Sequence, residues 1–186
     1  MKIAFVIFEG MTALDFVGIF DPVTRLKTMG FIEELSWEVC SLTEDVPDGA
    51  GLRILPTRVG GSLEAFDLVI VPGGYGTRRL ARDPAFVEWL RTAERCRLKA
   101  SVCTGSVLLG AAGFLKGKRA TTHRTSFEDL RPFCEEVVDQ RIVDEGDVIS
   151  ARGVSSALDL GLHLCERLAG PEVKEKIRTQ MDYQCA

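Results

Sequence analysis

Residues 98–115 read LKASVCTGSVLLGAAGFL, and this stretch decides the fold. The apolar run that ends at Cys103 is nearly continuous, as expected for a strand buried on both faces. A helical pattern follows, from Thr104 to Ala112, and Gly113 stops it. A buried strand that turns at once into a helix is the building unit of α/β proteins, and here Cys103 occupies the turn.

The same alternation continues along the whole chain. Short apolar runs predict strands over residues 2–8, 37–42, 67–71, 100–103, 119–122 and 148–150. Helical patterns cover 12–29, 84–97, 104–112, 155–168 and 173–181. Asp83 and Pro84 have the residue types of an N-cap and a first helical position. Residues 141–150 predict a hairpin, and 52–59 a minor strand pair around Pro56. The alternation predicts an α/β sandwich with a mostly parallel sheet.

Composition limits the classes of protein that need to be considered. The chain has 186 residues, of which 46% are hydrophobic, and this predicts a single domain over residues 1–186. The net charge is −4, with acids and bases interspersed, so we expect no nucleic-acid or anionic membrane partner. The first apolar run stops at Glu9 without a cleavage site, and no run could span a bilayer, so we expect a cytoplasmic protein.

The cysteines indicate neither a disulfide framework nor a metal site. There are six, at positions 40, 96, 103, 134, 165 and 185, with no Cys-x-x-Cys pair and no zinc-type spacing to a histidine. We therefore expect reduced thiols and no bound metal or cofactor. A free cysteine usually packs as a small buried hydrophobe, so only Cys103, at its turn, stands out.

Candidate site residues follow several predicted strands, at the end where open parallel sheets bind ligands. They lie in the loop after Phe8, in the glycine loop after Val71, at the 103 turn and after Thr122, and they are Asp15, Gly73, Gly74, Cys103, Thr104 and His123. Each also has a structural interpretation. Asp15 could simply complement a helix dipole, the glycines could form a plain turn, and His123 could only line the site. His163, in the middle of a helix, is interpreted as structural.

Cys103 has the stronger functional interpretation. A sharp strand-to-helix turn exposes its central side chain, as a nucleophile elbow does. The helix N-terminus should favour a thiolate there, and neighbouring N–H groups could bind an oxyanion. His123 could serve as a base or orienting group for Cys103. Candidates for the walls of the site are Phe16, Ile19, Tyr75 and Thr125.

Several motifs together resemble a known family across nearly the whole chain. They are Val71-Pro-Gly-Gly, Val102-Cys-Thr-Gly, Ala120-Thr-Thr-His and Ser150-Ala-Arg-Gly followed by a helix. In this order and spacing they resemble the DJ-1/PfpI (ThiJ) superfamily. The resemblance implies a flavodoxin-like three-layer sandwich, a cysteine at a strained nucleophile elbow and a homodimer.

One branch of that family resembles the chain more specifically. Asp15 in Leu14-Asp-Phe-Val-Gly, combined with Cys103-Thr-Gly, is similar to the isonitrile hydratases. That resemblance implies attack by Cys103 on the isonitrile carbon, with Asp15 as general acid and base and Thr104 orienting the intermediate. Gly73, Gly74 and His123 would bind substrate or oxyanion. We expect the pKa of Asp15 to be raised beside the thiol. Many relatives have proline where this chain has Ile19.

Three alternatives remain open. The first is a cofactor-independent glyoxalase or deglycase that also uses Cys103, although Asp15 is shorter than the glutamate of those relatives. The second is a stress sensor in which Cys103 is oxidised to the sulfinic acid. The third is the sensory half of an AraC-like regulator. Such regulators continue into a helix-turn-helix domain, whereas this sequence ends at Ala186, so we do not expect that function.

Overall fold

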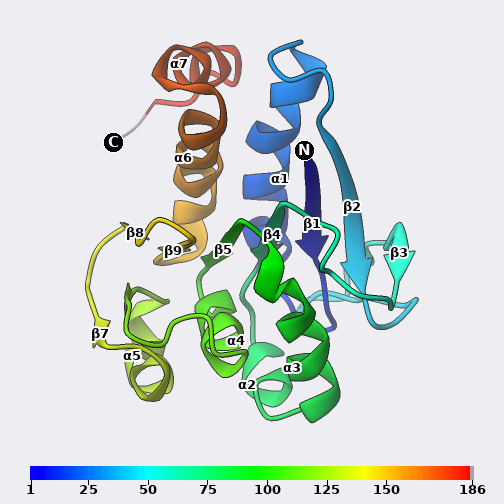
Figure 1. Ribbon diagram of the computed structural model, residues 1–186, viewed down its shortest axis with the longest axis vertical. Helices are drawn as coiled ribbons and strands as arrows, with labels where there is room; N and C mark the ends of the chain where they lie inside the picture. Colours follow the sequence, from blue (N-terminus) through cyan, green and yellow to red (C-terminus); the bar gives the residue numbers. More distant parts are fainter. Residues whose placement is uncertain (185–186) are drawn as a thin grey trace.

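The computed structural model describes residues 1–184, and its centre is a seven-stranded sheet. The strand order is β3-β2-β1-β4-β5-β9-β8 (Figure 1). The strands are β1 (Lys2–Val6), β2 (Ser36–Ser41), β3 (Arg58–Val59), β4 (Leu68–Val71), β5 (Leu98–Val102), β8 (Ile142–Asp144) and β9 (Val148–Ala151). All neighbours are parallel except β8 and β9, which form the predicted hairpin. The predicted α/β class with a mostly parallel sheet is confirmed.

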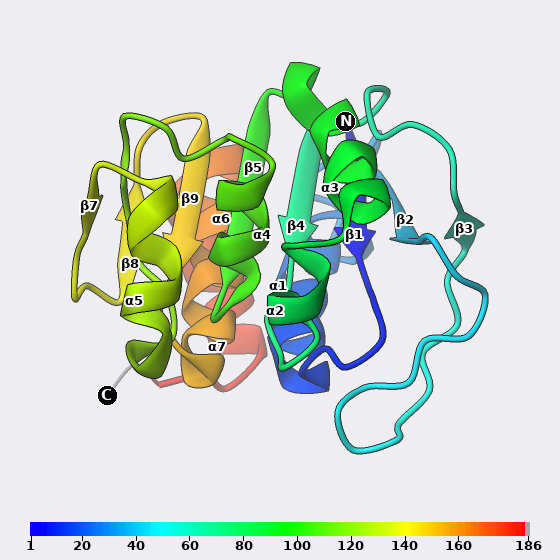
Figure 2. The same cartoon turned by 90° about the horizontal axis from the view of Figure 1, so that it is seen from below.

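Helices cover both faces of the sheet, which gives the three layers that the family resemblance implied (Figure 2). One layer contains α1 (Ala13–Thr28), α6 (Ala157–Ala169) and α7 (Pro171–Gln180). The other contains α2 (Thr77–Leu80), α3 (Pro84–Arg91), α4 (Gly105–Ala111) and α5 (Phe127–Leu130). Short 3-10 turns lie at 92–95, 124–126, 131–133 and 154–156. The side chain of Asp83 accepts from the N–H groups of Ala85 and Phe86, so the predicted N-cap of α3 is confirmed.

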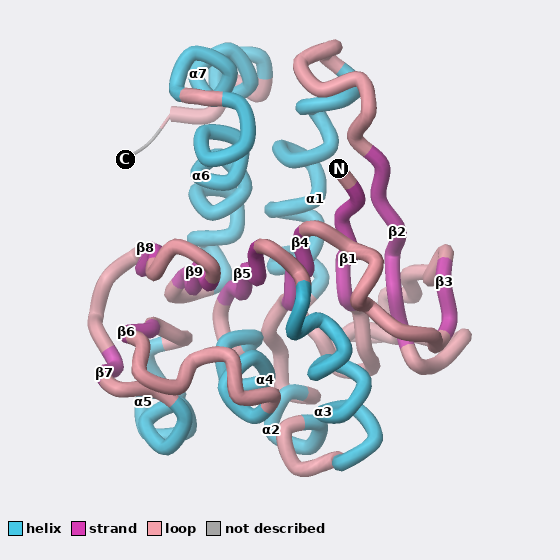
Figure 3. The backbone as a smooth tube through the Cα atoms, viewed as in Figure 1, coloured by secondary structure: helices cyan, strands magenta, loops and turns pink. Residues whose placement is uncertain are grey.

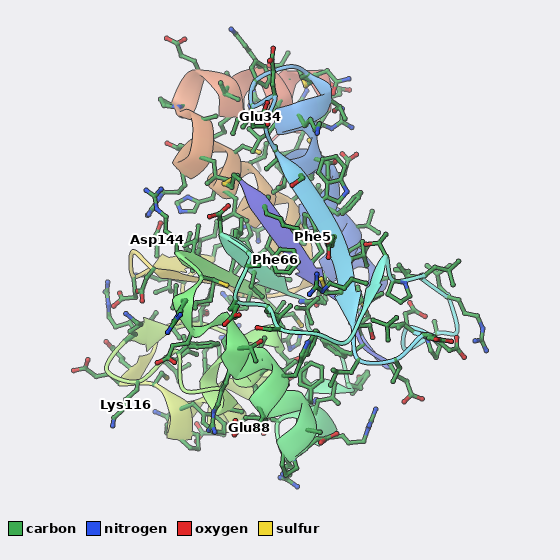
Figure 4. The ribbon with its side chains drawn as sticks, turned by 45° about the vertical axis from the view of Figure 1, so that its right-hand side comes forward. Phe5, Glu34, Phe66, Glu88, Lys116 and Asp144 are labelled. Carbon is green, nitrogen blue, oxygen red and sulfur yellow. The ribbon has the colours of Figure 1, made fainter. Side chains whose placement is uncertain are left out.

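The central strands are buried because helices cover them on both sides. Every residue of β4 and β5 is buried, as the continuous apolar runs predicted. Phe5 of β1 lies in the interior, whereas Glu88 and Lys116 extend outward from the surface (Figure 4). Apolar burial therefore holds the central strands in the sheet, and the candidate site residues lie where these strands end.

Two glycines let α1 and α6 pack closely. A Cβ at Gly18 would lie 2.7 Å from Cβ of Ala157, and one at Gly161 would lie 2.3 Å from Cγ of Pro22. Neither helix could carry a larger side chain there without moving away. Helix α1 continues through Pro22, and Ile19, where many relatives have proline, is fully buried against the core.

Two sequence predictions need correction, and one short helix was not predicted. Residues 119–122 do not join the main sheet: only Arg119–Ala120 form a strand, β6, which pairs with β7 (Glu136–Val137) in a separate two-stranded sheet (Figure 3). The strand that pairs with β5 on the side away from β4 is β9. Of residues 52–59, only Arg58–Val59 form a strand, which extends the main sheet beside β2. Helix α2 was not predicted, because its four residues are too few to show a periodicity.

Candidate active site

Cys103 lies at a strained turn between β5 and α4. Its φ is 55°, and among residues 1–184 the only other non-glycine residue with positive φ is Asp182. The turn is held by a 3.0 Å hydrogen bond from the N–H of Cys103 to the carbonyl oxygen of Ala151. A Cβ at Gly105 would lie 2.3 Å from the carbonyl oxygen of Val71, so the elbow can pass this point only with glycine. The strained elbow implied by the family resemblance is present.

Asp15 comes to the same place from the first turn of α1. Its side chain is fully buried, and Oδ2 accepts a 2.9 Å hydrogen bond from the backbone N–H of Gly73. Oδ1 is buried without a hydrogen-bond partner in the described part of the chain. The carboxyl also interacts with the Cys103 thiol. A carboxyl and a thiol from distant parts of the sequence therefore form one buried pair.

Burial dominates the proton affinities of this pair. It raises the pKa of Asp15 to about 6, against a smaller lowering by the Gly73 N–H and the thiol. The predicted direction is confirmed, but the main cause is desolvation rather than the neighbouring sulfur. Burial, with Asp15 beside it, also raises the pKa of Cys103 to about 12. The expectation of a thiolate favoured by the helix N-terminus is therefore wrong: the N–H of Thr104 lowers this pKa, but less than burial raises it.

The glycine loop after β4 is hydrogen-bonded to Asp15 through Gly73 and to Thr104 through Gly74. The N–H of Gly74 donates to Oγ1 of Thr104 at 2.9 Å, and that hydroxyl donates to the carbonyl oxygen of Gly74 at 3.1 Å. A Cβ at Gly73 would lie 2.5 Å from the Thr104 nitrogen and 2.8 Å from Cβ of Cys103. Both predicted oxyanion donors therefore already have acceptors, Asp15 and Thr104. Their binding of substrate stays a prediction.

A small cavity of about 140 Å³, here called the thiol cavity, opens over Cys103, whereas Asp15 and Gly73 are not among its lining residues. It is lined by Thr12, Gly74, Tyr75, Arg78, Cys103, Thr104, His123, Thr125, Ser126 and Val154. The sequence identified Gly74, Cys103, Thr104 and His123, and among the wall candidates Tyr75 and Thr125. The other two wall candidates, Phe16 and Ile19, are in the core.

No sequence pattern pointed to Thr12, Arg78, Ser126 and Val154 as residues in the wall of the thiol cavity. Arg78 comes from α2, a helix that the sequence did not reveal. Its Nη2 donates to Oγ of Ser126 at 2.8 Å and lies 3.2 Å from Oδ2 of Asp129. Tertiary placement alone therefore brings this cation to the wall.

His123 reaches the cavity although its strand is not part of the main sheet. The preceding residues are tied down: the N–H of Thr121 donates to Oγ of Ser150, and the hydroxyl of Thr122 donates to the carbonyl oxygen of Cys103. Nδ1 of His123 lies 2.9 Å from Oγ1 of Thr125. No hydrogen bond joins His123 to Cys103 within residues 1–184, so the histidine lines the site without a hydrogen bond to the thiol.

The remaining predicted features lie elsewhere. Nε2 of His163, in α6, lies 2.8 Å from Oδ2 of Asp144 at the end of β8, and neither residue lines the thiol cavity. This agrees with the structural interpretation of His163. Cysteines 40, 96, 103, 134 and 165 are free thiols, and Cys185 lies outside the described residues. In residues 1–184 no three His, Cys, Asp or Glu side chains group as metal ligands. None of the described helices has the length and apolar character to cross a membrane.

Comparison with known proteins places the chain in a family. The sequence profile of the DJ-1/PfpI family matches residues 1–167. The chain is 32% identical to isonitrile hydratase from Pseudomonas putida, over 98% of this chain and 78% of that protein. It is also 32% identical to the glutathione-independent glyoxalase DJR-1.2 of Caenorhabditis elegans, over 71% of this chain and 72% of that protein. A solved THiJ/PfpI family protein from Pseudomonas syringae superposes with a TM-score of 0.88 at 30% identity, over 100% of this chain and 76% of that chain.

Proposed function

The chain belongs to the DJ-1/PfpI family, and we propose that within it the protein is an isonitrile hydratase, which converts R–NC and water to an N-substituted formamide. The observation that carries the proposal is the buried Asp15–Cys103 pair, of which Cys103 lines a small cavity and Asp15 lies buried behind it. The similarity to isonitrile hydratase over 98% of the chain supports it.

The first step forms a covalent adduct. An isonitrile carbon is electrophilic and carries a lone pair, and sulfur is an intrinsically strong nucleophile. Asp15, as carboxylate, takes the proton of the Cys103 thiol while sulfur bonds to the carbon. The same proton then goes from Asp15 to that carbon, which gives the thioimidate R–N=CH–S–Cys103. An adjacent base is needed because burial keeps the thiol protonated at rest.

The second step consumes water. Asp15, again a carboxylate, accepts a proton as water adds to the thioimidate carbon, and that proton passes to nitrogen. The tetrahedral intermediate R–NH–CH(OH)–S–Cys103 collapses: the carbon–sulfur bond breaks, the hydroxyl proton returns to sulfur, and R–NH–CHO leaves. A carboxyl with a pKa of about 6 can both accept and donate protons near neutral pH.

The surrounding groups keep this pair in place. Gly73 fixes Asp15 through its N–H, and Thr104 holds the Gly74 backbone beside the thiol. We assign Thr104 the further task of orienting the intermediate, and Gly73, Gly74 and His123 contact with substrate. Gly74, Thr104 and His123 line the thiol cavity, which supports their part of this assignment, whereas Gly73 lies outside the lining.

A direct assay tests the proposal. The purified protein is incubated with p-nitrophenyl isocyanide, and the formamide is measured by chromatography and NMR. We expect turnover, and none by Cys103→Ala, because covalent catalysis is lost. Cys134→Ala, at a half-buried free thiol remote from the thiol cavity, is the matched control and should retain activity. Undiminished turnover by Cys103→Ala would eliminate the mechanism.

A glyoxalase is the second candidate, because the nematode relative with that activity is equally identical over 71% of the chain. It would use the same thiol on methylglyoxal without glutathione. Measuring kcat/KM for methylglyoxal and for an isonitrile on one preparation separates the two. An oxidation sensor fits less well, since a sensor cysteine needs a low pKa and burial raises that of Cys103 to about 12.

We further propose a cytoplasmic homodimer, following the family resemblance. A nucleophilic cysteine must stay reduced, and the described cysteines are free. Leu14 and Val17 of α1 are 55% and 46% exposed, which offers an apolar surface for a second copy. Light scattering on the purified protein measures the mass in solution, and a monomer mass would reject the dimer.

A further inference from the structure

A second cavity adjoins the thiol cavity. It has a volume of about 600 Å³ and shares His123 and Val154 with the thiol cavity as lining residues. The rest of its lining is Arg124, Arg141, Arg152, Gly153, Ser155 and Ser156. We call it the basic cavity. The proposed reaction uses none of these arginines.

The lining of the two cavities carries positive charge without a lining acid. Arg78 faces the thiol cavity and three arginines face the basic cavity, while no Asp or Glu lines either one in the described chain. Three of these arginines form ion pairs, Arg78 with Asp129, Arg141 with Asp159 and Arg152 with Asp139, and all three acids lie outside the lining. Arg124 is exposed, and no ion pair involving it occurs within residues 1–184. The cavities therefore favour an anion.

The guanidinium of Arg78, which lines the thiol cavity, has N–H donors that its two protein partners do not use. Its Nη2 is used by Ser126 and Asp129. The guanidinium has five N–H donors, so Nε and Nη1 remain for a ligand. A guanidinium binds a carboxylate or phosphate through paired hydrogen bonds, which are stronger than those between neutral groups.

The volumes indicate which part of a ligand goes where. Pockets for whole small molecules commonly measure about 300–1,000 Å³. The thiol cavity, at about 140 Å³, has room for a reactive group and a few further atoms. A larger substrate must continue past His123 and Val154, and there it meets Arg124 and Arg152.

We propose that the two cavities form one binding site for a substrate with an anionic tail, with the electrophilic group at Cys103 and a carboxylate among the arginines of the basic cavity. This inference deepens the proposed function: the substrates would be isonitriles that carry a carboxylate, rather than neutral ones. Arg124 is the residue on which the test concentrates, because its side chain is exposed and its replacement disturbs no ion pair seen in the structure.

The first experiment compares ω-isocyano alkanoates of increasing chain length with their methyl esters. We expect the acid to exceed its ester in kcat/KM by about tenfold at the best length, and Arg124→Gln to remove most of that preference through KM. Arg82→Gln is the matched control, since Arg82 is also exposed but lines neither cavity. Equal values for acid and ester in the unmodified protein would overturn the proposal.

The second experiment does not depend on isonitrile turnover. The rates at which iodoacetate and iodoacetamide alkylate Cys103 are measured by peptide mass spectrometry at low salt. We expect Arg124→Gln to lower the iodoacetate-to-iodoacetamide ratio about threefold and Arg82→Gln to leave it unchanged. A fall in the ratio without any isonitrile turnover supports the anion site and rejects the hydratase. Turnover with a ratio unaffected by Arg124→Gln retains the hydratase and rejects the anion site.

Discussion

The backbone N–H of Gly73 donates a 2.9 Å hydrogen bond to Oδ2 of Asp15 and so ties the loop after β4 to the first turn of α1. The same loop is bonded through Gly74 to Thr104, the residue after Cys103. Acid, loop and elbow thus form one connected unit. Because the acid and the thiol lie on different elements, their relative position depends on this loop.

Asp15 should set the acid limb of the pH–rate profile. The pair reacts with one proton shared between carboxyl and thiol, so kcat/KM should fall below pH about 6 and stay level up to pH 9, given pKa values of about 6 and about 12. Asp15→Asn should lower kcat by about 10²–10⁴ and abolish the limb. Steady-state kinetics from pH 4.5 to 9 measure both. A limb that persists in Asp15→Asn would assign it to another group.

The same substitution should stabilise the fold at high pH. The pKa of Asp15 is raised from 3.8 to about 6, so its contribution to stability is present below pH 3.8 and is lost as the pH rises through about 6. That difference corresponds to about 3 kcal/mol, less whatever the amide loses in hydrogen bonding. Urea unfolding at pH 8 should therefore show Asp15→Asn more stable by about 1–2 kcal/mol, with the gain gone at pH 4. A gain in stability that persists at pH 4 would contradict the assignment to the Asp15 carboxyl.

A methyl group at Gly73 should separate the reacting pair. The added Cβ would lie 2.5 Å from the Thr104 nitrogen and 2.9 Å from Oδ2 of Asp15, with backbone on one side that cannot give way. We expect Gly73→Ala to lose at least 100-fold in kcat and about 1–3 kcal/mol in stability. Gly49→Ala meets only Met11 oxygen at 3.7 Å and serves as the control. Near-normal kcat in Gly73→Ala would show that the loop moves freely.

Thr104 should act through its hydroxyl. Thr104→Val keeps the shape but leaves the Gly74 N–H without its acceptor in a buried place, a loss of about 1–3 kcal/mol in stability. Thr104→Ser keeps the hydroxyl and should retain most stability and rate. Thermal unfolding and kcat of both variants are compared. If valine and serine behave alike, the hydroxyl has no positioning role.

The strand ends were predictable because hydrophobic runs are local and long. The runs ending at Val71 and Cys103 are each buried on both faces, and parallel pairing then brings Gly73 and Cys103 to one edge of the sheet. His123 lies at the site as predicted, although the segment before it is not part of the main sheet. Buried hydrogen bonds of Thr121 and Thr122 hold that segment in place of sheet pairing.

The rest depended on information that no short window of sequence contains. Two predicted strands, 119–122 and 148–150, could pair with β5 on the side away from β4. Only the completed fold shows that 148–150 does so. The proton affinity of Cys103 follows from the depth of burial, which outweighs the local effect of a helix terminus. The arginines of the two cavities come from α2, from 3-10 turns and from loops, where periodicity gives no signal.

The glycines at the crossing of α1 and α6 influence the position of Asp15 relative to Cys103, although they lie outside both cavities. Asp15 is one turn from Gly18, so the depth at which α1 sits on α6 sets how far its carboxylate reaches toward sulfur. Side-chain size at Gly18, Ala157 or Gly161 would change that reach in small steps without replacing any residue that lines either cavity. Evolution toward new electrophiles can therefore proceed by exchanges between two helices, and a mutant library confined to the cavity would miss them.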